Sequence, residues 1–470
     1  MHSPLSAIVR RDPVTVPLDA TVRSALEAME RAHLDFMVVT DAGRGLPLGI
    51  FTLRDLVRRV ALPGGDLEQP VAAVMTAGLA TLPPEASAHQ AALAMARSGV
   101  RTVVVVDAEG RLAGVVSQED LFGLQRMGVA EIGREIQAAG DVEALRPVGP
   151  RIRQLAAGLM AQGIGAETLT HFISTLNDLL TIRLVEIVAD RFELPPVPTC
   201  FMALGSEGRL EQTFATDQDN GIVFEADDGD AERVRQGLLP FARAVNQALA
   251  DCGFALCKGE VMAGNPRWCL SLEEWRRAFQ AWVASPRPAA LLDACIAYDL
   301  RPVHGREALA ERLRASALEA AAAHPLFLRG LAECAVRSRP PLGLFRRFVY
   351  GRSAEFPHTL NLKLRGSSPY VDAARVYALA HRVPHTSTAQ RLRALAGVLH
   401  LDPWDLSAKV DGFHFIHLQR LRHQCRPGLP AGAANLLDPR EISDLDRHVR
   451  REAFLQARRL QARLVLDFQL

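Results

Sequence analysis

The sequence predicts a multidomain protein that combines α/β and α+β architecture. Its 470 residues are more than a single hydrophobic core usually serves. The first part of the chain contains two similar segments in which strands alternate with a helix. The rest has mainly helical periodicity, interrupted by a polar stretch between two apolar strands. We therefore expect a repeated α/β module, a helical connector, a domain with a mixed sheet and a mainly α-helical C-terminal domain, with bounds at 1–125, 126–197, 198–285 and 286–470.

The composition is that of a globular protein without a strong charge. Hydrophobic residues make up 49% of the chain and charged residues 23%, and the net charge is +1. This balance argues against nucleic acid as a partner. The seven cysteines form no C-x-x-C pair, so we expect free thiols in a reducing cytosol. The chain shows no signal core and no apolar stretch of about 18 residues. We expect a cytoplasmic protein with no membrane partner.

The repeat occupies residues 12–60 and 77–122. Each copy predicts a helix, a β-branched strand, a turn and a second strand. The second strands end in the tetrapeptides 52–55 and 117–120. A hydroxyl at a helix start can hold a phosphate beside the helix amides, and an aspartate three residues later can bind ribose hydroxyls. The same residues can equally be N-caps with an acid in the first helical turn, and the two roles are compatible.

The stretches "GIFTLRDL" and "GVVSQEDL" make this pair similar to a tandem CBS-domain module. The resemblance implies a regulatory pair that binds adenine nucleotides such as AMP or ATP and forms a homodimer. It places Thr52, Asp55, Ser117 and Asp120 at the phosphate and ribose positions.

A helical connector follows the repeat. Apolar residues recur every three to four positions in 167–192, after two glycines and before a Pro-Pro pair. This pattern predicts one long helix with a buried stripe formed by Leu169, Phe172, Leu176, Leu180, Leu184 and Ile187. The helix could transmit a state from the repeat to the rest of the chain, or serve only as a packing layer.

The central motif is "ALGSEGRLEQTFATDQDNGIVF", residues 203–224. Gly205 and Ser206 follow a buried strand, where backbone amides can form an anion-holding nest, and Arg209 can pair with phosphate. Asp217 and Asp219 share one face if the segment is extended. Two carboxylates on one face suit Mg²⁺ beside substrate phosphates, as in nucleotidyl transfer. A solvated polar turn is the alternative for Asp-x-Asp alone.

This motif resembles the polymerase-β-like nucleotidyltransferase superfamily, and in particular the group that includes the N-terminal domain of PII uridylyltransferase. The resemblance extends over about 140–470 and includes "LNDLLTIRLVEI" and "KGEVMAGNPRWCLSLEEW". It implies a nucleoside triphosphate, UTP or ATP, on Gly205 and Ser206, with Arg209 as a phosphate contact and Glu211 fixing the loop. It further implies Asp217 and Asp219 as catalytic Mg²⁺ ligands. Glu260 is the candidate for a third acidic residue on a later strand, with an exposed strand-end glutamate as the alternative.

The C-terminal part offers weaker candidates. Lys363 and Arg365 alternate along an extended segment and either reach phosphates or are exposed charges. His414 and His417 are three residues apart on a helix without a third ligand, so we reject a zinc site. Two larger sets are an aromatic core group, Trp268, Trp275, Phe279 and Trp282, and a solvated or partner-docking basic face on the last helix, Arg450, Arg451, Arg458, Arg459 and Arg463.

The leading function is Mg²⁺-dependent transfer of a nucleotide to a protein or small-molecule acceptor, regulated by adenine nucleotides on the repeat. The alternative is a non-catalytic scaffold that senses nucleotides and transduces a signal. A polymerase acting on nucleic acid is disfavoured by the neutral charge.

Overall fold

The computed structural model describes residues 5–7, 9, 14–32, 34–98, 100–117, 129–343, 348–350, 355–430, 432–441 and 443–470. The chain divides into two compact units, Met1–Glu131 and Ile132–Leu470. The mixed α/β multidomain architecture predicted from the sequence is confirmed. The finer bounds at residues 197 and 285 remain predictions.

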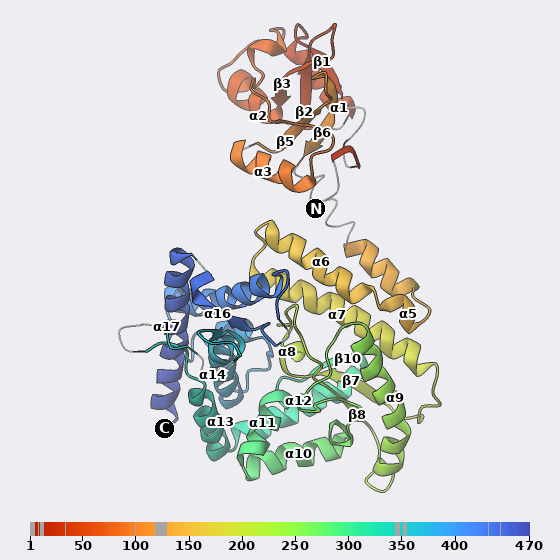
Figure 1. The fold of residues 1–470 in the computed structure, drawn as a ribbon, viewed down its shortest axis with the longest axis vertical. Helices are drawn as coiled ribbons and strands as arrows, with labels where there is room; N and C mark the ends of the chain where they lie inside the picture. The colour runs from red at the N-terminus through yellow and green to blue at the C-terminus, as the bar shows by residue number, and fades with distance from the viewer. Residues whose placement is uncertain are drawn as a thin grey trace. The chain divides into compact units, whose positions relative to one another are not determined.

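The smaller unit contains two copies of one motif (Figure 1). In each copy a short strand pairs parallel with the next strand, which pairs antiparallel with the third, giving the sheets β1-β2-β3 and β4-β5-β6. The first copy consists of β1 (Thr15–Pro17), α1 (Val22–Ala32), β2 (Phe36–Thr40), β3 (Pro47–Thr52) and α2 (Leu53–Asp55), which continues into the π-helical η2 (Leu56–Ala61). The second consists of β4 (Thr81–Leu82), α3 (Ala88–Ser98), β5 (Thr102–Val106) and β6 (Leu112–Ser117).

The second copy takes part of its core from the start of the chain. Leu5, in the 3₁₀ turn η1 (Leu5–Ala7), is fully buried and belongs to the core cluster of the second copy. Its amide donates to the Ala86 carbonyl oxygen at 2.7 Å, and the Ser6 amide donates to that of Pro84 at 2.9 Å. The second copy is therefore assembled from two separate segments of the sequence.

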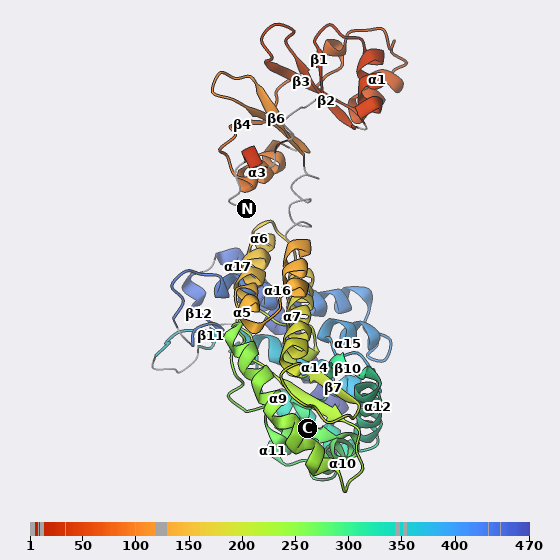
Figure 2. The same ribbon diagram turned by 90° about the vertical axis from the view of Figure 1, so that its right-hand side faces the viewer.

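The larger unit is built on a mixed sheet with the strand order β10-β7-β8-β9. β7 pairs antiparallel with β10 and β8, and β8 pairs parallel with β9. The helices α7 (Ala166–Ala189) and α9 (Ala231–Asp251) lie on one side of the sheet and α12 (Glu307–Ala322) lies on the other (Figure 2). The four strands are β7 (Thr199–Ala203), β8 (Asn220–Phe224), β9 (Cys269–Ser271) and β10 (Arg301–Gly305), so the sheet extends past the predicted core boundary.

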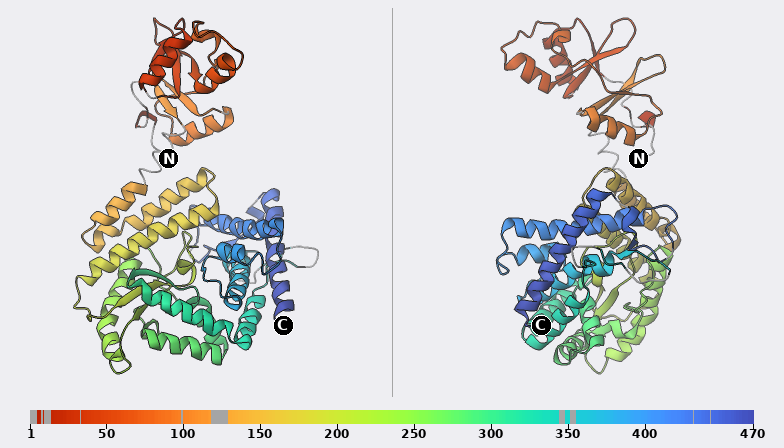
Figure 3. Two further views of the ribbon diagram at one scale, coloured as in Figure 1. Left: turned by 180° about the vertical axis from the view of Figure 1, so that it is seen from behind. Right: turned by 60° about the vertical axis from the view of Figure 1, so that its left-hand side comes forward.

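Helices surround this sheet and form the rest of the unit. The last helices, α16 and α17, lie on the side away from α9 (Figure 3). Before and between the sheet strands come α5 (Val142–Leu145), α6 (Val148–Ala161), α7 (Ala166–Ala189), α8 (Gly205–Gly208), α9 (Ala231–Asp251), α10 (Leu272–Ala284) and α11 (Pro288–Ala297). After it come α12 (Glu307–Ala322), α13 (Pro325–Arg337), the small strands β11 (Leu360–Asn361) and β12 (Leu436–Leu437), the π-helical η6 (Lys363–Ser367), α14 (Ser368–Ala380), α15 (Thr388–Ala394), α16 (Pro403–Gln424) and α17 (Asp444–Asp467).

One large hydrophobic core joins the sheet to the C-terminal helices. It includes Cys200 and Met202 of β7 together with residues of α10 to α14 and α17. The predicted aromatic core group is confirmed, although Trp268 lies in a 3₁₀ turn before β9 rather than on helix α10. None of the helices in the described ranges combines the length and apolar character needed to cross a bilayer.

Two predictions for the C-terminal part are wrong. The last helix does not carry a uniformly solvated arginine face: because α17 packs against α13, α14 and α16, Arg450 is fully buried and donates to Gln419. Of the five arginines of the predicted face, only Arg459 is exposed. Lys363 and Arg365 do not share one face of an extended segment. The backbone there is π-helical, and Arg365 turns away to donate to the Arg339 carbonyl oxygen at 3.1 Å.

Candidate functional site

A tight turn after β7 brings the two ends of the central motif together. Gly205 has a left-handed φ of 53°, which favours glycine. A Cβ atom at this position would lie 2.6 Å from Oδ2 of Asp219, so the missing side chain makes room for that carboxylate. Gly208 is equally constrained, since its Cβ would lie 1.8 Å from the Asp299 carbonyl oxygen. The two glycines thus fix the turn against both Asp219 and the loop before β10.

The segment before β8 is extended, and its side chains alternate as the sequence predicts. Asp217 forms an isolated parallel bridge with Ala255, and the Gln218 amide donates to the Ala255 carbonyl oxygen. The Gln218 side chain points into the protein and donates to the backbone of Asn246 and Phe254. Asp217 and Asp219, on either side of it, both line a cavity.

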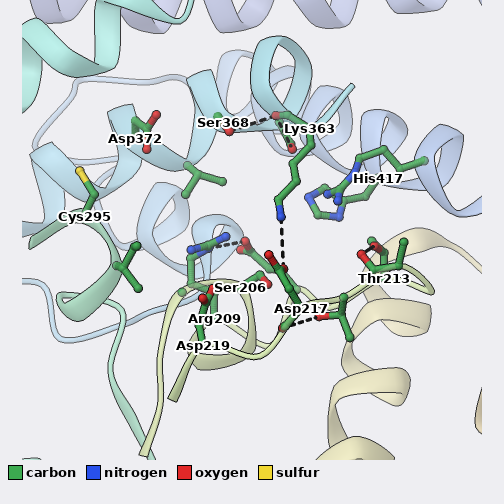
Figure 4. Close-up of a pocket in the computed structure, with 18 of the residues that line it drawn as sticks. Ser206, Arg209, Thr213, Asp217, Asp219, Cys295, Lys363, Ser368, Asp372 and His417 are labelled. Atoms are coloured by element: carbon green, nitrogen blue, oxygen red, sulfur yellow. Dashed lines mark hydrogen bonds and ion pairs between the residues drawn. The ribbon is translucent and has the colours of Figure 1, made fainter. Parts of the chain in front are cut away.

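This cavity has a volume of about 190 Å³ and lies between the central motif and the C-terminal helices. Figure 4 shows Lys363, Ser368 and His417 on the wall opposite Ser206, Asp217 and Asp219. Nζ of Lys363 lies 3.4 Å from Oδ1 of Asp217. The motif contributes Gly205, Ser206, Arg209, Glu211, Thr213, Ala215, Thr216, Asp217 and Asp219, and the other walls are Cys295, Ile296, Lys363, Ser367, Ser368, Val371, Asp372, Arg375, His417 and Arg420.

Negative charge is concentrated at the motif. Burial and the nearby Asp217 carboxylate raise the pKa of Asp219 to about 6. Burial and the neighbouring Asp178 raise the pKa of Glu207 to about 8, although Arg301 opposes the shift. A divalent cation would relieve the repulsion between the two carboxylates, so this part of the cavity fits Mg²⁺. Throughout the described ranges no three His, Cys, Asp or Glu side chains converge as metal ligands, so phosphates and water would complete its coordination.

A buried ion cluster supports the cavity from behind. The Asp299 carboxylate, with no exposed surface, accepts from Arg209 at 2.7 Å, Arg375 at 2.6 Å and Arg391 at 2.7 Å. Burial alone would raise the pKa of Asp299, but the three guanidinium groups hold it well below its usual range. Glu211 accepts from Arg209 Nε at 2.7 Å and from the Thr388 amide at 2.7 Å. The cluster therefore ties the motif to α14 and α15.

The structure brings most of the predicted transferase residues into one place. Gly205, Ser206, Arg209, Glu211, Asp217 and Asp219 all line the cavity. Glu260 does not: it is exposed in a turn with a φ of 53°, because the predicted later strand is reduced there to the single bridge at Ala255. The adjacent strand β9 contains Cys269, Leu270 and Ser271 and thus no carboxylate.

The predicted nucleotide residues of the repeat lie in the smaller unit. Thr52 and Asp55 form a capping box, and Oδ1 of Asp55 also accepts from the Thr76 hydroxyl at 3.0 Å. Ser117 ends β6 at the position that corresponds to Thr52 in β3. Asp120 falls outside the described residues.

Asp299, Arg375, His417 and Arg420 are among the cavity and support residues that were not predicted as such from the sequence. Asp299 and Arg375 lie in segments that read as ordinary helix and loop, and their pairing joins positions 76 residues apart. His417 was considered only as a zinc ligand, and Arg420 was not singled out. Polar residues at i and i+3 within the otherwise buried face of α16 were the available signal.

The arrangement agrees with the comparison with protein families. Residues 150–289 match the family "Putative nucleotidyltransferase DUF294" and residues 325–468 match "Putative nucleotidyltransferase substrate binding domain". Residues 5–62 and 71–126 each match the CBS domain. This chain is a fusion of two CBS domains with a DUF294 nucleotidyltransferase region. In this DUF294 region, residues from both matched ranges, 150–289 and 325–468, line the cavity.

Relatives of the CBS–DUF294 chain cover about a quarter of its length. An uncharacterized protein of Methanopyrus kandleri is 28% identical over 132 residues, which are 28% of this chain and 66% of that protein. Arabinose 5-phosphate isomerase of Escherichia coli K12 is 33% identical over 117 residues, 24% of this chain and 36% of the isomerase. This chain thus covers less than two thirds of the length of each of these two relatives.

Solved structures give the same coverage. A CBS domain protein from Pyrobaculum aerophilum, solved in complex with AMP, is 30% identical and covers 25% of this chain and 89% of its own, with a TM-score of 0.24. A CBS-domain protein from Agrobacterium tumefaciens is 34% identical and covers 26% of this chain and 93% of its own, with a TM-score of 0.25.

Proposed function

We propose that this protein is an Mg²⁺-dependent nucleotidyltransferase that transfers a nucleoside monophosphate from UTP or ATP to a hydroxyl group of a protein or small-molecule acceptor. The observation that carries the proposal is the convergence of Asp217, Asp219, Gly205 and Ser206 on one cavity. The likeness of the motif to PII uridylyltransferase supports this class of reaction.

The transfer joins the acceptor to the nucleotide at phosphorus. The hydroxyl oxygen attacks the α-phosphorus, the bond to the bridging oxygen breaks, pyrophosphate leaves, and the hydroxyl proton passes to solvent. Bound Mg²⁺ would neutralise charge on the phosphates. Asp217 and Asp219 would hold that cation, Ser206 would donate to a phosphate oxygen, and Lys363, 3.4 Å from Asp217, would move to the phosphates. Because the pKa of Asp219 is raised to about 6, a cation held by this carboxylate would displace its proton below about that pH.

Regulation is the second half of the proposal. The CBS pair would bind AMP or ATP through Thr52, Asp55, Ser117 and Asp120, and the chain would form a homodimer through this pair. Since Asp55 already accepts from Thr52 and Thr76, a ribose hydroxyl would exchange with one of these bonds. A ligand alters transfer only if it binds one state of the protein better than another.

The test of catalysis uses α-³²P-labelled UTP and ATP, Mg²⁺ and cell lysate as the source of acceptor. We expect label transfer by the natural chain and its loss, by at least a hundredfold, in Asp217→Asn and Asp219→Asn. Glu260→Gln is the matched control, because Glu260 is exposed outside the cavity, and it should keep full activity. Transfer that survives in both aspartate variants would refute the proposal.

A non-catalytic nucleotide-sensing scaffold is the second candidate. It is favoured by the lack of a carboxylate on β9 and by the exposed position of Glu260. In this case the natural chain binds Mg²⁺ and nucleotide, measured by calorimetry, and transfers no label to any fraction of the lysate.

A further inference from the structure

One cation of the cavity differs from the others in its partners. Arg209 pairs with Glu211 and Asp299, Arg375 pairs with Asp299 and Asp372, and Lys363 pairs with Asp217. Arg420, on α16, makes no ion pair with a described residue. Among the described residues, the hydrogen-bond partner of Arg420 is Asn435: Nε of Arg420 donates to Oδ1 of Asn435 at 3.0 Å. The two terminal nitrogens thus keep their donors for something else.

Arg420 is also deeply buried, with 5% of its surface exposed. Burial and the nearby Arg209 lower its pKa to about 10, and Glu211 and Asp217 oppose the shift only in part. A buried guanidinium without a carboxylate partner costs free energy. The Arg420 guanidinium lies on the cavity wall, where a negatively charged ligand can compensate its positive charge.

His417 lies one helical turn before Arg420 on the same face of α16. It is 3% exposed, its ring packs 4.5 Å from that of Phe413, and neither ring nitrogen has a hydrogen-bond partner among the described residues. Figure 4 shows the ring on the cavity wall beside Lys363. Two buried, incompletely bonded polar side chains therefore line the same cavity.

The position of this pair relates it to the motif. The loop before Asp217 packs against α16, where the Ala215 amide donates to Oε1 of Gln424 at 3.2 Å. Figure 4 shows His417 and Thr213 on one side of Asp217, and Ser206 and Asp219 on the other side. We propose that Arg420 and His417 form a binding subsite for a phosphate-type oxyanion carried by a ligand of this cavity.

Arg420 would hold two oxygens with its terminal nitrogens, as guanidinium groups do with phosphates, and His417 would donate to a third. Two sources share this chemistry: a phosphate group on the acceptor and the terminal phosphate of the nucleotide. The choice between these sources rests on the proposed function, whereas the oxyanion subsite itself does not.

The test measures binding of inorganic phosphate to the full chain by calorimetry. We expect binding by the natural protein, at least tenfold weaker binding by Arg420→Met, and a smaller, severalfold loss for His417→Phe, which keeps the packing on Phe413. Arg422→Met is the matched control, because Arg422 lies on the same helix but is exposed; it should bind as the natural chain does. Phosphate affinity unchanged in both Arg420→Met and His417→Phe overturns the proposal.

Thermal unfolding separates a ligand role from a structural one. If Arg420 serves a ligand, Arg420→Met has a melting temperature no lower than the natural chain without phosphate, and phosphate raises that of the natural chain alone. If Arg420 serves only the fold, Arg420→Met melts earlier and phosphate shifts both proteins equally, which contradicts the subsite. Should Arg420→Met fail to fold, Arg420→Lys and His417→Phe carry the same comparison.

A second titration identifies the source. Phosphate is added to protein saturated with Mg²⁺ and an α,β-methylene nucleoside triphosphate. Phosphate that still binds assigns the subsite to the acceptor, and phosphate that is excluded assigns it to the terminal phosphate of the nucleotide. If label transfer fails while phosphate binding depends on Arg420, the subsite stands and the transferase proposal falls.

Discussion

Asp299 shows how a single residue can hold a site together without entering it. Its carboxylate accepts from arginines of three separate segments, the motif loop, α14 and α15, and none of its surface is exposed. Removing one partner of a buried ion cluster leaves the other charges uncompensated. Two of these arginines, Arg209 and Arg375, also line the cavity. The ion cluster therefore fixes the position of the cavity wall that these two side chains form.

We therefore predict that Asp299→Asn lowers the free energy of unfolding by roughly 3–5 kcal/mol, measured by urea denaturation. Asp228→Asn is the control, because Asp228 forms an equally short pair with Arg277 that is largely exposed. This variant should unfold almost as the natural chain does. Equal effects of the two substitutions would contradict the role of the cluster.

Glu207 predicts a pH dependence of stability. Its pKa is about 8 in the folded protein because of burial and Asp178, above its ordinary value of about 4.3. The folded state then binds the proton more tightly than the unfolded state, so its contribution to stability is lost as the pH rises towards 8. Glu207→Gln should match the natural chain at pH 4, below the unfolded pKa, and be more stable by roughly 4–5 kcal/mol at pH 9. Denaturation curves at both pH values test this, and equal stability at pH 9 would show that Glu207 is not buried in its neutral form.

At the scale of elements, the sequence was informative wherever periodicity and local turn chemistry decide the structure. The stripe of α7, the repeated strands and the Gly205 turn were all predictable, since each depends on residues near in sequence. The motif also predicted that Gly205 and Ser206 share one site with Asp217 and Asp219, although not the close contact between Gly205 and Asp219. Both carboxylates of the motif were thus foreseen as neighbours of the turn.

Contacts between distant segments were not predictable in this way. Lys363 reaches Asp217 from 146 residues further along the chain, and the π-helical turn of η6 is what separates it from Arg365. Arg450 reads as one of several arginines on a helix, yet α16 covers it. The missing carboxylate near β9 follows from the loss of a strand around Glu260, which no local pattern signals.

The η6 segment yields a prediction of its own. Nζ of Lys363 competes with a cation for Oδ1 of Asp217, so Lys363→Met should bind Mn²⁺ severalfold more tightly in the absence of nucleotide. The same variant should bind nucleoside triphosphate more weakly, because it loses a phosphate partner. Arg365→Met, whose side chain points to Arg339, should change neither affinity. Electron paramagnetic resonance of Mn²⁺ and nucleotide titrations give both readouts, and weaker Mn²⁺ binding by Lys363→Met would contradict the competition.

At the scale of the whole molecule, the chain consists of a CBS unit and a DUF294 unit that are each compact. All residues that line the cavity belong to the second unit. Residues 132–470 should therefore fold alone, with a single cooperative unfolding transition, and keep the basal label transfer of the full chain. Added AMP or ATP should alter transfer by the full chain, each nucleotide being compared with a matched amount of Mg²⁺, and leave the shortened chain unaffected. A shortened chain that still responds to AMP would place the regulatory site outside the CBS pair.

The burial of Leu5 against the second CBS copy has a consequence for the order in which the protein is made. Leu5, which completes the core of the second copy, is synthesised before the first copy, whereas the strands of the second copy are complete only when Ser117 has been added. The first copy can fold in the interval, while Leu5 stays uncovered. In the folded protein, Leu5 precedes the first copy in the sequence but packs into the core of the second copy. A single cut between the two copies should therefore leave two fragments that remain associated through Leu5.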